Sequence, residues 1–313
     1  MAGDGYMLNF VSLMQNLSAK VKTDKVDPMY LFNPNSKVQL KDETRLKMTE
    51  QEANDWVKTL CKTRRFNFQE LFSHVSIPTA DNPEHKWLTP NFHTECWFLT
   101  LQAHHISIMP AIRRYQRKLR ALRELQKMVE ELEKTEPQWS VSMHAGRNRS
   151  LLKRYKSQLK KLSKSKACSD TGLLDVKLLS RTMEFYSSAA EVLIGAMTEH
   201  VSKETGLLEA SGSLNLVLPL KEDTPAEFAA LPEWIIDDIA DFLIFAMQYF
   251  SNVISESLKQ PLLTFLLMIV CTPSYFNNPY LGEFIKLAGR GNVRKVTPTF
   301  SFFQSQKSSR SSL

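Results

Sequence analysis

Apolar residues recur at three- and four-residue spacing in one segment after another of this 313-residue chain. Such spacing places them on one face of an α-helix, whereas a half-buried strand would alternate strictly. The first segment covers residues 5–21, and its stripe is formed by Met7, Leu8, Phe10, Val11, Met14 and Leu17. The same pattern predicts helices over residues 111–134, 147–167, 173–202, 232–250, 252–272 and 279–288. No segment has a convincing strand pattern.

Capping signals predict where further helices begin. The segment Thr49-Glu-Gln-Glu52 fits a capping box, with the apolar side of its helix formed by Trp56, Val57 and Leu60. Thr89 is expected to cap a buried helix with Pro90 in its first turn, and this helix should stop or kink at Pro110. The segment 224–227 carries a threonine cap, a proline and an acid, which also indicates a helix start. The Asp-Pro and Asn-Pro steps of residues 27–34 predict a loop.

The chain is therefore expected to be all-α, an elongated armadillo- or HEAT-like stack of helical pairs. Residues 1–288 would form this helical core, and residues 289–313 a disordered, basic, Ser-rich tail. The tail holds five basic residues and no acid, so it accounts for most of the net charge of +7. A nucleic-acid-binding protein usually concentrates its basic charge on the folded domain instead.

Cysteine usage and hydropathy indicate the compartment. The four cysteines Cys61, Cys96, Cys168 and Cys271 are widely spaced and form no CxxC pair, which is typical of a reducing compartment. The start of the chain lacks the pattern of a secretory signal. The apolar run 262–271 is about half as long as the roughly 20 residues of a membrane-spanning helix. We therefore expect buried helices and no membrane segment.

Two groups of residues could carry chemistry. His93, Cys96, His104 and His105 resemble a metal cluster, but the chain lacks HExxH and a second ligand pair at zinc spacing, so we expect residues of a core helix. Cys96 as a nucleophile would need an activating base, and its apolar neighbours favour packing. Asp237, Asp238 and Asp241 could act as acids or bases, or bind basic side chains, but an exposed acidic helix face is the favoured interpretation. We predict no catalytic, cofactor-binding or metal-ligating residue, and no cofactor.

Two basic runs offer a binding surface. Residues 113–123 hold six basic residues, and residues 147–166 hold nine lysines or arginines and no acid. They could bind RNA, acidic lipid or an acidic protein, or form a solvated helix face. Tyr115 and Tyr155 fall on the apolar stripes, so aromatic side chains for base stacking are sparse. The solvated face is favoured, an acidic protein partner comes next, and no nucleic-acid partner is expected.

Three stretches carry a resemblance to a known family. They are Thr89 to Glu124, Phe228 to Leu243, and Asn278 to Leu281, and the early segment Gly3 to Phe10 joins them. Together they are similar to the core region of ubiquitin conjugation factors that elongate ubiquitin chains. The resemblance covers about residues 1–288 and implies an armadillo-like helical solenoid.

The resemblance also implies a function. In that family a U-box follows the core and recruits a charged ubiquitin-conjugating enzyme, and the ligase extends chains on substrates bound for the proteasome. In this sequence the U-box is missing, so ubiquitin-protein transferase activity of this chain alone is not expected. The function implied is a ubiquitin–ubiquitin ligase core that serves as a scaffold. A non-catalytic adaptor, or a competitor of the full-length ligase, is the alternative, and a basic-helix RNA binder is a third hypothesis.

The partners implied are ubiquitin or a ubiquitinated substrate, and a segregase ATPase. The conjugating enzyme would be reached only through the missing U-box. No nucleic acid and no membrane are expected among the partners. The implied location is cytoplasmic and nuclear.

Overall fold

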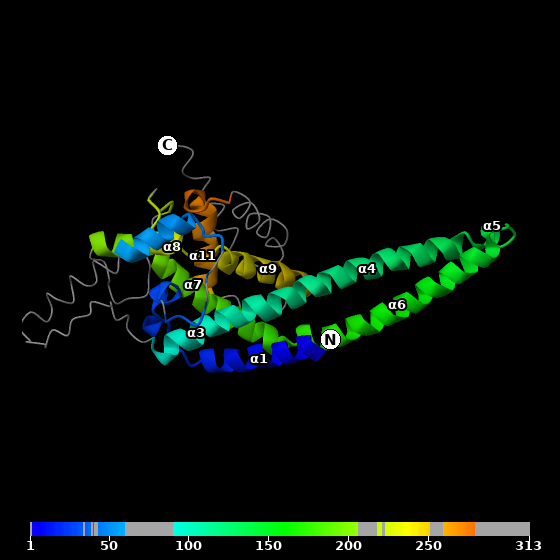
Figure 1. Ribbon diagram of the computed structural model, residues 1–313, viewed down its shortest axis with the longest axis horizontal. Coiled ribbons are helices and arrows are strands. Elements are labelled where there is room, and N and C mark those ends of the chain that lie inside the picture. Colours follow the sequence, from blue (N-terminus) through cyan, green and yellow to red (C-terminus); the bar gives the residue numbers. More distant parts are fainter. Residues whose placement is uncertain are drawn as a thin grey trace, which may run out of the picture. The chain divides into compact units, whose positions relative to one another are not determined.

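The computed structural model describes residues 2–33, 35–38, 40, 43–59, 90–205, 218–220, 223–250 and 259–278, with side chains from residue 5 onward and without those of 199–205 (Figure 1). Within these ranges all regular elements are helices, and the sole β-type pairing is the isolated bridge between Arg45 and Pro232. The all-α prediction is confirmed. None of the described helices has the length and apolar run needed to cross a membrane.

The chain divides into two compact units. The first, here called the hairpin unit, comprises Met1–Leu13 and Ala103–Arg181. The second, here called the core unit, comprises Met14–Gln102 and Thr182–Leu313. The divisions fall inside α1 (Ala2–Ser18) and α7 (Val176–Thr205), so both helices contribute residues to each unit.

The hairpin unit is built on two long antiparallel helices. These are α4 (Met109–Lys134) and α6 (Ala145–Leu173), which lie side by side and are joined by the short α5 (Glu136–Trp139) (Figure 1). At the turn, Trp139 packs with Val129 and Leu152, and its indole Nε1 donates to the Leu132 carbonyl at 2.8 Å. This antiparallel pair is the kind of unit from which armadillo- and HEAT-like stacks are built.

The prediction that the helix stops or kinks at Pro110 is wrong in its first alternative, because the helix does not stop there. Helical backbone continues through Pro110 into α4, and the π-helical turn η3 (His104–Ile108) comes just before it. A proline removes one backbone donor and crowds the preceding turn. A π turn at this place shifts the hydrogen-bond pattern by one residue, which allows the helix to continue past the proline.

The core unit holds the remaining elements. They are η1 (Thr23–Lys25), η2 (Pro28–Phe32), the helical residues 50–59, α3 (Phe92–Ala103), α8 (Ala226–Ala229), α9 (Trp234–Tyr249), α11 (Gln260–Cys271) and η4 (Pro273–Tyr275). Its centre is aromatic and fully buried, with Tyr186, Phe242, Phe245 and Phe265 among the largest side chains. The ring centroids of Tyr186 and Phe242 lie 5.3 Å apart. Aromatic pairs at this distance contribute beyond their buried area.

Helix α3 is central to this core, as its all-round apolar sequence predicts. Cys96, Trp97, Phe98 and Leu101 are buried, and the Trp97 indole donates to the Ser188 hydroxyl at 3.1 Å. The capping prediction at its start is only partly right. Thr89 lies outside the described residues and Pro90 precedes the helix, while the Asn91 side chain accepts from the Thr94 backbone N–H at 2.8 Å. Asparagine is among the strongest cap residues, so the helix begins one residue after it.

The predicted N-terminal caps of the other helices are confirmed in one case and wrong in another. The capping box at Thr49 is confirmed, because the Glu52 carboxylate accepts from the Thr49 backbone N–H at 2.8 Å and the Thr49 hydroxyl accepts from the Glu52 N–H at 3.3 Å. Thr224 does not cap α8: its hydroxyl accepts from the Lys47 ammonium at 2.9 Å, and α8 is a single turn with Pro225 at its N-cap position. The segment 27–34, predicted as a loop, contains the one-turn helix η2. Asp27 caps it by accepting from the Met29 N–H at 2.9 Å.

The predicted stripe of the first helix divides over two faces of α1. Val11 and Met14 are buried, as expected. Phe10 and Leu17 are exposed instead, and they share a face with Tyr6 and Leu13. Spacings of three and four residues occur within both sets, so the sequence alone does not distinguish the face that packs from the face that does not.

Several predictions concern residues outside the described ranges. They are the buried position of Leu60, the first part of the helix 252–272, the helix 279–288 and the tail 289–313. Trp56 and Val57, predicted to lie inward with Leu60, are half-buried, and Trp56 packs edge-on against Phe32 with ring centroids 5.3 Å apart.

Candidate functional site

The residues that suggested a metal site lie on two successive elements. His93 and Cys96 are on α3, and His104 and His105 are on η3. Among the described residues no group of three or more histidine, cysteine, aspartate or glutamate side chains could hold a metal ion. Cys96 is 4% exposed, and burial raises the pKa of its thiol. A buried, protonated thiol is a packing residue rather than a nucleophile.

The three aspartates of α9 do not form the exposed acidic face that the sequence favoured. Asp238 is 1% exposed, and Asp237 and Asp241 are half-buried. Burial, with the negative charges of Asp238 and Asp241, raises the pKa of the Tyr186 hydroxyl well above its usual range. Asp238 therefore lies in the interior of the core unit, near Tyr186. Asp237 also lies in the first turn of α9, where the helix dipole favours a negative charge.

Basic side chains are concentrated on the α4–α6 hairpin. On α4 they include Arg117, Arg120 and Arg123, which are exposed. On α6 they are exposed at Arg147, Arg149, Lys153, Arg154, Lys156, Lys160, Lys161 and Lys164. The inward stripes of both helices are apolar, so the helices pack through these stripes and carry their charges outward. The hairpin is therefore the candidate interaction surface of the chain.

Ion pairs and hydrogen bonds across the hairpin fix its register. The Lys156 ammonium lies 2.6 Å from the Glu133 carboxylate, so the acidic second half of α4 is next to the basic first half of α6. Towards the other end, the Tyr115 hydroxyl donates to Asp170 Oδ1 at 2.8 Å. Charge on the distal half of the hairpin is thereby partly balanced, as expected if neighbouring acidic helices neutralise the basic runs.

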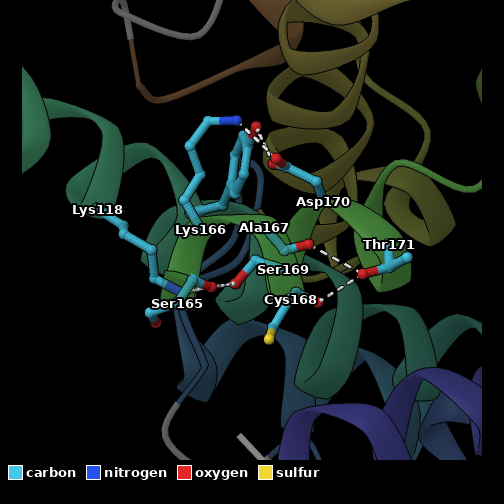
Figure 2. A network of polar contacts seen from close by, with 9 residues as sticks. Lys118, Ser165, Lys166, Ala167, Cys168, Ser169, Asp170 and Thr171 are labelled. Atoms are coloured by element: carbon cyan, nitrogen blue, oxygen red, sulfur yellow. Dashed lines mark hydrogen bonds and ion pairs between the residues drawn. The ribbon is translucent and has the colours of Figure 1, made fainter. Parts of the chain in front are cut away.

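A polar network joins α4 and α6 at the level of Asp170 (Figure 2). The Lys118 ammonium donates to the Ser169 hydroxyl at 2.6 Å and to the Ser165 carbonyl at 3.1 Å. Lys166 pairs with Asp170 at 2.6 Å within α6. Two lysines that the sequence places in the basic runs are thus used inside the hairpin and do not contribute to the exposed basic surface.

The stretches that carry the family resemblance contribute mainly to packing. In the core unit, the segment 44–48 runs beside 229–233, with the Leu46 N–H donating to the Leu231 carbonyl at 2.9 Å. The Asn277 N–H donates to the Leu46 carbonyl at 2.9 Å, and the Asn278 side chain donates to Glu233. Two of the resembling stretches therefore meet in space, because Asn278, the first residue of one, contacts Glu233 of the other. A small apolar cavity of about 20 Å³ beside Trp97, Phe98, Leu231 and Ile235 lies in the same unit and has room for about one water molecule.

Comparison with known proteins identifies the family. The family model described as "ubiquitin elongating factor core" matches residues 1–307. The chain belongs to the ubiquitin elongating factor core family. The match extends over both the hairpin unit and the core unit, so the elements described above are those of this family's core.

Curated relatives agree with this assignment. Ubiquitin conjugation factor E4 of Schizosaccharomyces pombe is 25% identical over 284 residues, which are 89% of this chain and 25% of that protein. Ubiquitin conjugation factor E4 ufd-2 of Caenorhabditis elegans is 26% identical over 282 residues, with the same two shares of 89% and 25%. A probable ubiquitin conjugation factor E4 of Arabidopsis thaliana is 22% identical over 307 residues, 90% of this chain and 27% of the relative. This elongating factor core therefore spans about a quarter of the length of the relatives it matches.

Sequence reasoning missed the internal polar contacts of the hairpin. Lys118 and Ser169 are 51 residues apart along the chain, Tyr115 and Asp170 are 55 apart, and each pair meets only through the register of the two helices. An acid next to a run of lysines, as at Asp170, was the available signal. It could not be interpreted without knowing which residue of α4 lies opposite.

Proposed function

We propose that this elongating factor core acts as a helical scaffold in ubiquitin-chain elongation. It would hold ubiquitin, or a substrate that already carries ubiquitin, while chains are extended for proteasomal degradation. The family match over residues 1–307 carries this proposal. The exposed charged surface of the α4–α6 hairpin supports it, because a rigid antiparallel helix pair is suited to binding a protein partner.

Transfer of ubiquitin is assigned to a U-box and a charged conjugating enzyme, as the resemblance implies, and not to residues 1–313 alone. A segregase ATPase is the further partner that we propose. We also propose that the chain works in the cytoplasm and nucleus, which cell fractionation with a peptide-specific antibody would test.

A reconstituted chain-elongation assay tests the scaffold function. Residues 1–313 are combined with activating enzyme, conjugating enzyme, ubiquitin and a mono-ubiquitinated substrate. They are tested alone and as a competitor of a complete ligase of the family. The expected result is no chain growth with residues 1–313 alone and a dose-dependent inhibition of the complete ligase. A heat-unfolded sample of the same chain is the control for non-specific inhibition.

Two other outcomes of the chain-elongation assay would contradict the scaffold proposal. Chain growth with residues 1–313 alone would show that transfer does not need the U-box, and the scaffold proposal would be wrong. Absence of both growth and competition would show that the chain holds none of the ligase's partners under these conditions, which also contradicts the proposal. Inhibition without growth is the result shared by a scaffold and a competing adaptor. Fusion of the chain to a U-box separates these two, since only the scaffold then supports elongation.

A further inference from the structure

One side of the α4–α6 hairpin carries basic residues from both helices. We propose that this side, defined by Arg123, Lys127, Arg149, Lys153 and Lys160 and here called the basic side, binds an acidic segment of a partner protein. This goes beyond the scaffold function above and does not depend on it. All five side chains are exposed, and they belong to the hairpin unit alone.

Helix geometry places these five residues together. Each residue of an α-helix is turned by about 100° from the one before it. Measured from the apolar stripe that faces the other helix, Arg123 of α4 is turned to one side, and Lys127 lies about 40° further round, at the outer edge of that side. Arg149, Lys153 and Lys160 of α6 are turned in the same sense from the stripe that includes Leu152. Because antiparallel helices are related by a two-fold axis perpendicular to the hairpin, equal turns bring both sets to the same side.

The charges of the basic side are available to a ligand. Lys156, between Lys153 and Lys160, is used by Glu133, with 2.6 Å between Nζ and Oε1. None of the five basic-side residues forms an ion pair with another described residue of the hairpin. Glu130 lies on this side of α4 too, but its carboxylate accepts from the Gln126 amide at 3.1 Å. Apart from the Lys156–Glu133 pair, the basic side thus combines five cations with one acid, Glu130.

Its dimensions fit a short extended peptide. Arg149 and Lys160 are eleven residues apart, which is about 16 Å along a helix. The axes of packed helices are about 8–10 Å apart. An extended chain rises about 3.3 Å per residue, so roughly five residues would cover the length, with alternate side chains directed to the surface. If every second residue of this segment is acidic, its carboxylates would be directed to the lysine and arginine side chains of the basic side.

The aromatic residues of the hairpin favour an acidic protein segment over RNA. Proteins that bind single-stranded nucleic acid combine a basic groove with exposed aromatic rings for stacking. In α4 and α6 the tyrosines are Tyr115, which is buried and bonded to Asp170, and Tyr155, which packs against the Val129–Trp139–Leu152 cluster. Neither ring is on the basic side, so this side offers no tyrosine ring for base stacking.

Neighbouring residues provide a matched control. Lys153 and Lys160 belong to the basic side, whereas Arg154 and Lys161 are turned by a further 100° and lie on the other side. The variants K153E/K160E and R154E/K161E change the net charge equally, on the same helix and one residue apart. R123E tests whether the surface spans both helices. Fluorescence anisotropy with a labelled octaglutamate peptide measures the binding to residues 1–313, and octauridylate RNA is the comparison.

The expected result is peptide binding that K153E/K160E weakens about tenfold, since two favourable surface pairs are lost and two repulsive pairs are created. R123E should weaken it by about threefold, and R154E/K161E by less than about twofold. Equal losses in K153E/K160E and R154E/K161E would show a diffuse field effect and overturn the proposal. If the RNA binds more tightly than the peptide and K153E/K160E abolishes that binding, the surface binds nucleic acid instead. An absence of peptide binding would also contradict the proposal. Circular dichroism checks folding, and K153Q/K160Q replaces K153E/K160E if that variant unfolds.

Discussion

At the scale of single residues, Tyr115 and Asp170 show how the hairpin uses its polar groups. Tyr115 is buried on the inward stripe of α4, and its hydroxyl donates to Asp170 at 2.8 Å. The same carboxylate pairs with Lys166 at 2.6 Å. A hydrogen bond to a charged acceptor is stronger than a neutral one, so this contact fixes the register of the two helices more firmly than apolar packing would.

Tyr115→Phe is therefore expected to destabilise the hairpin unit by about 1.5–3 kcal/mol, the range for a hydrogen bond to a charged group. Urea unfolding followed by circular dichroism measures the change. Tyr155→Phe is the matched control, because Tyr155 is half-buried and packs through its ring. Equal stability of Tyr115→Phe and the unchanged protein would show that the Asp170 contact contributes nothing.

Glu52 provides a prediction about pH. Hydrogen bonds from the Thr49 backbone N–H and then from the Thr49 hydroxyl lower the pKa of the Glu52 carboxyl. In the unfolded chain a glutamate has a pKa of about 4.3. A lowered pKa in the folded state means that the capping box stabilises the helix above that value and stops doing so as the pH falls through the folded pKa.

The helical signals of residues 50–59 should accordingly weaken as the solution is acidified below about pH 4. In Glu52→Gln they should not change over the same range, because the amide does not titrate. Carboxyl chemical shifts across an acid titration measure the pKa of Glu52 directly. A pKa at or above the ordinary glutamate value would contradict the expectation, and Thr49→Ala should raise it part of the way.

At the scale of elements, the α4–α6 hairpin depends on its turn. Two long helices with charged outer faces need an apolar contact where the chain reverses, and Trp139, Val129 and Leu152 supply it. The Trp139 indole also satisfies the Leu132 carbonyl near the end of α4. The ion pair between Lys156 and Glu133 is partly exposed, and such surface pairs contribute little to stability.

Trp139→Ala should cost about 3–5 kcal/mol, the range for removing a large buried side chain. The loss should be local, because the cluster belongs to the hairpin turn. Hydrogen exchange of backbone amides in residues 125–155 is expected to accelerate, while exchange in α3 and α9 stays unchanged. Met143→Ala is the control, since Met143 is 92% exposed in the same turn. Uniform acceleration along the whole chain would show that the turn is not a local unit.

At the scale of the whole molecule, stability rests on the aromatic centre of the core unit. Phe242 is fully buried and lies beside Tyr186 of α7 and on the same helix as Phe245. The residues that carry the family resemblance, such as Trp97 and Phe228, belong to the same interior. The family match therefore includes residues that pack the interior of this unit.

Phe242→Ala is expected to lower the free energy of unfolding by about 3–5 kcal/mol, and the Tm by roughly 10 °C. Differential scanning calorimetry measures both. Phe92→Ala is the matched control: Phe92 is 67% exposed, and its replacement should change stability by less than about 0.5 kcal/mol. Similar losses for the two variants would contradict the burial of Phe242.

The sequence alone determined the helical class, the approximate positions of the long helices and the family. Local signals suffice for these properties, because the period of 3.6 residues and the caps act over a few neighbouring residues. The capping box at Thr49 and the long helices of the hairpin were predictable for this reason. Apolar periodicity also placed Tyr115 on an inward stripe, and it is buried.

Only the tertiary structure decided which residues meet. Asp238 proved buried, Lys118 and Asp170 were taken into the hairpin, and the segment 44–48 paired with 229–233. It also decided which of the two apolar faces of α1 packs and how the chain passes Pro110. These outcomes depend on the register and packing between elements far apart in sequence. Charge and spacing within one helix contain no information about the partner helix, and so a single sequence leaves them open.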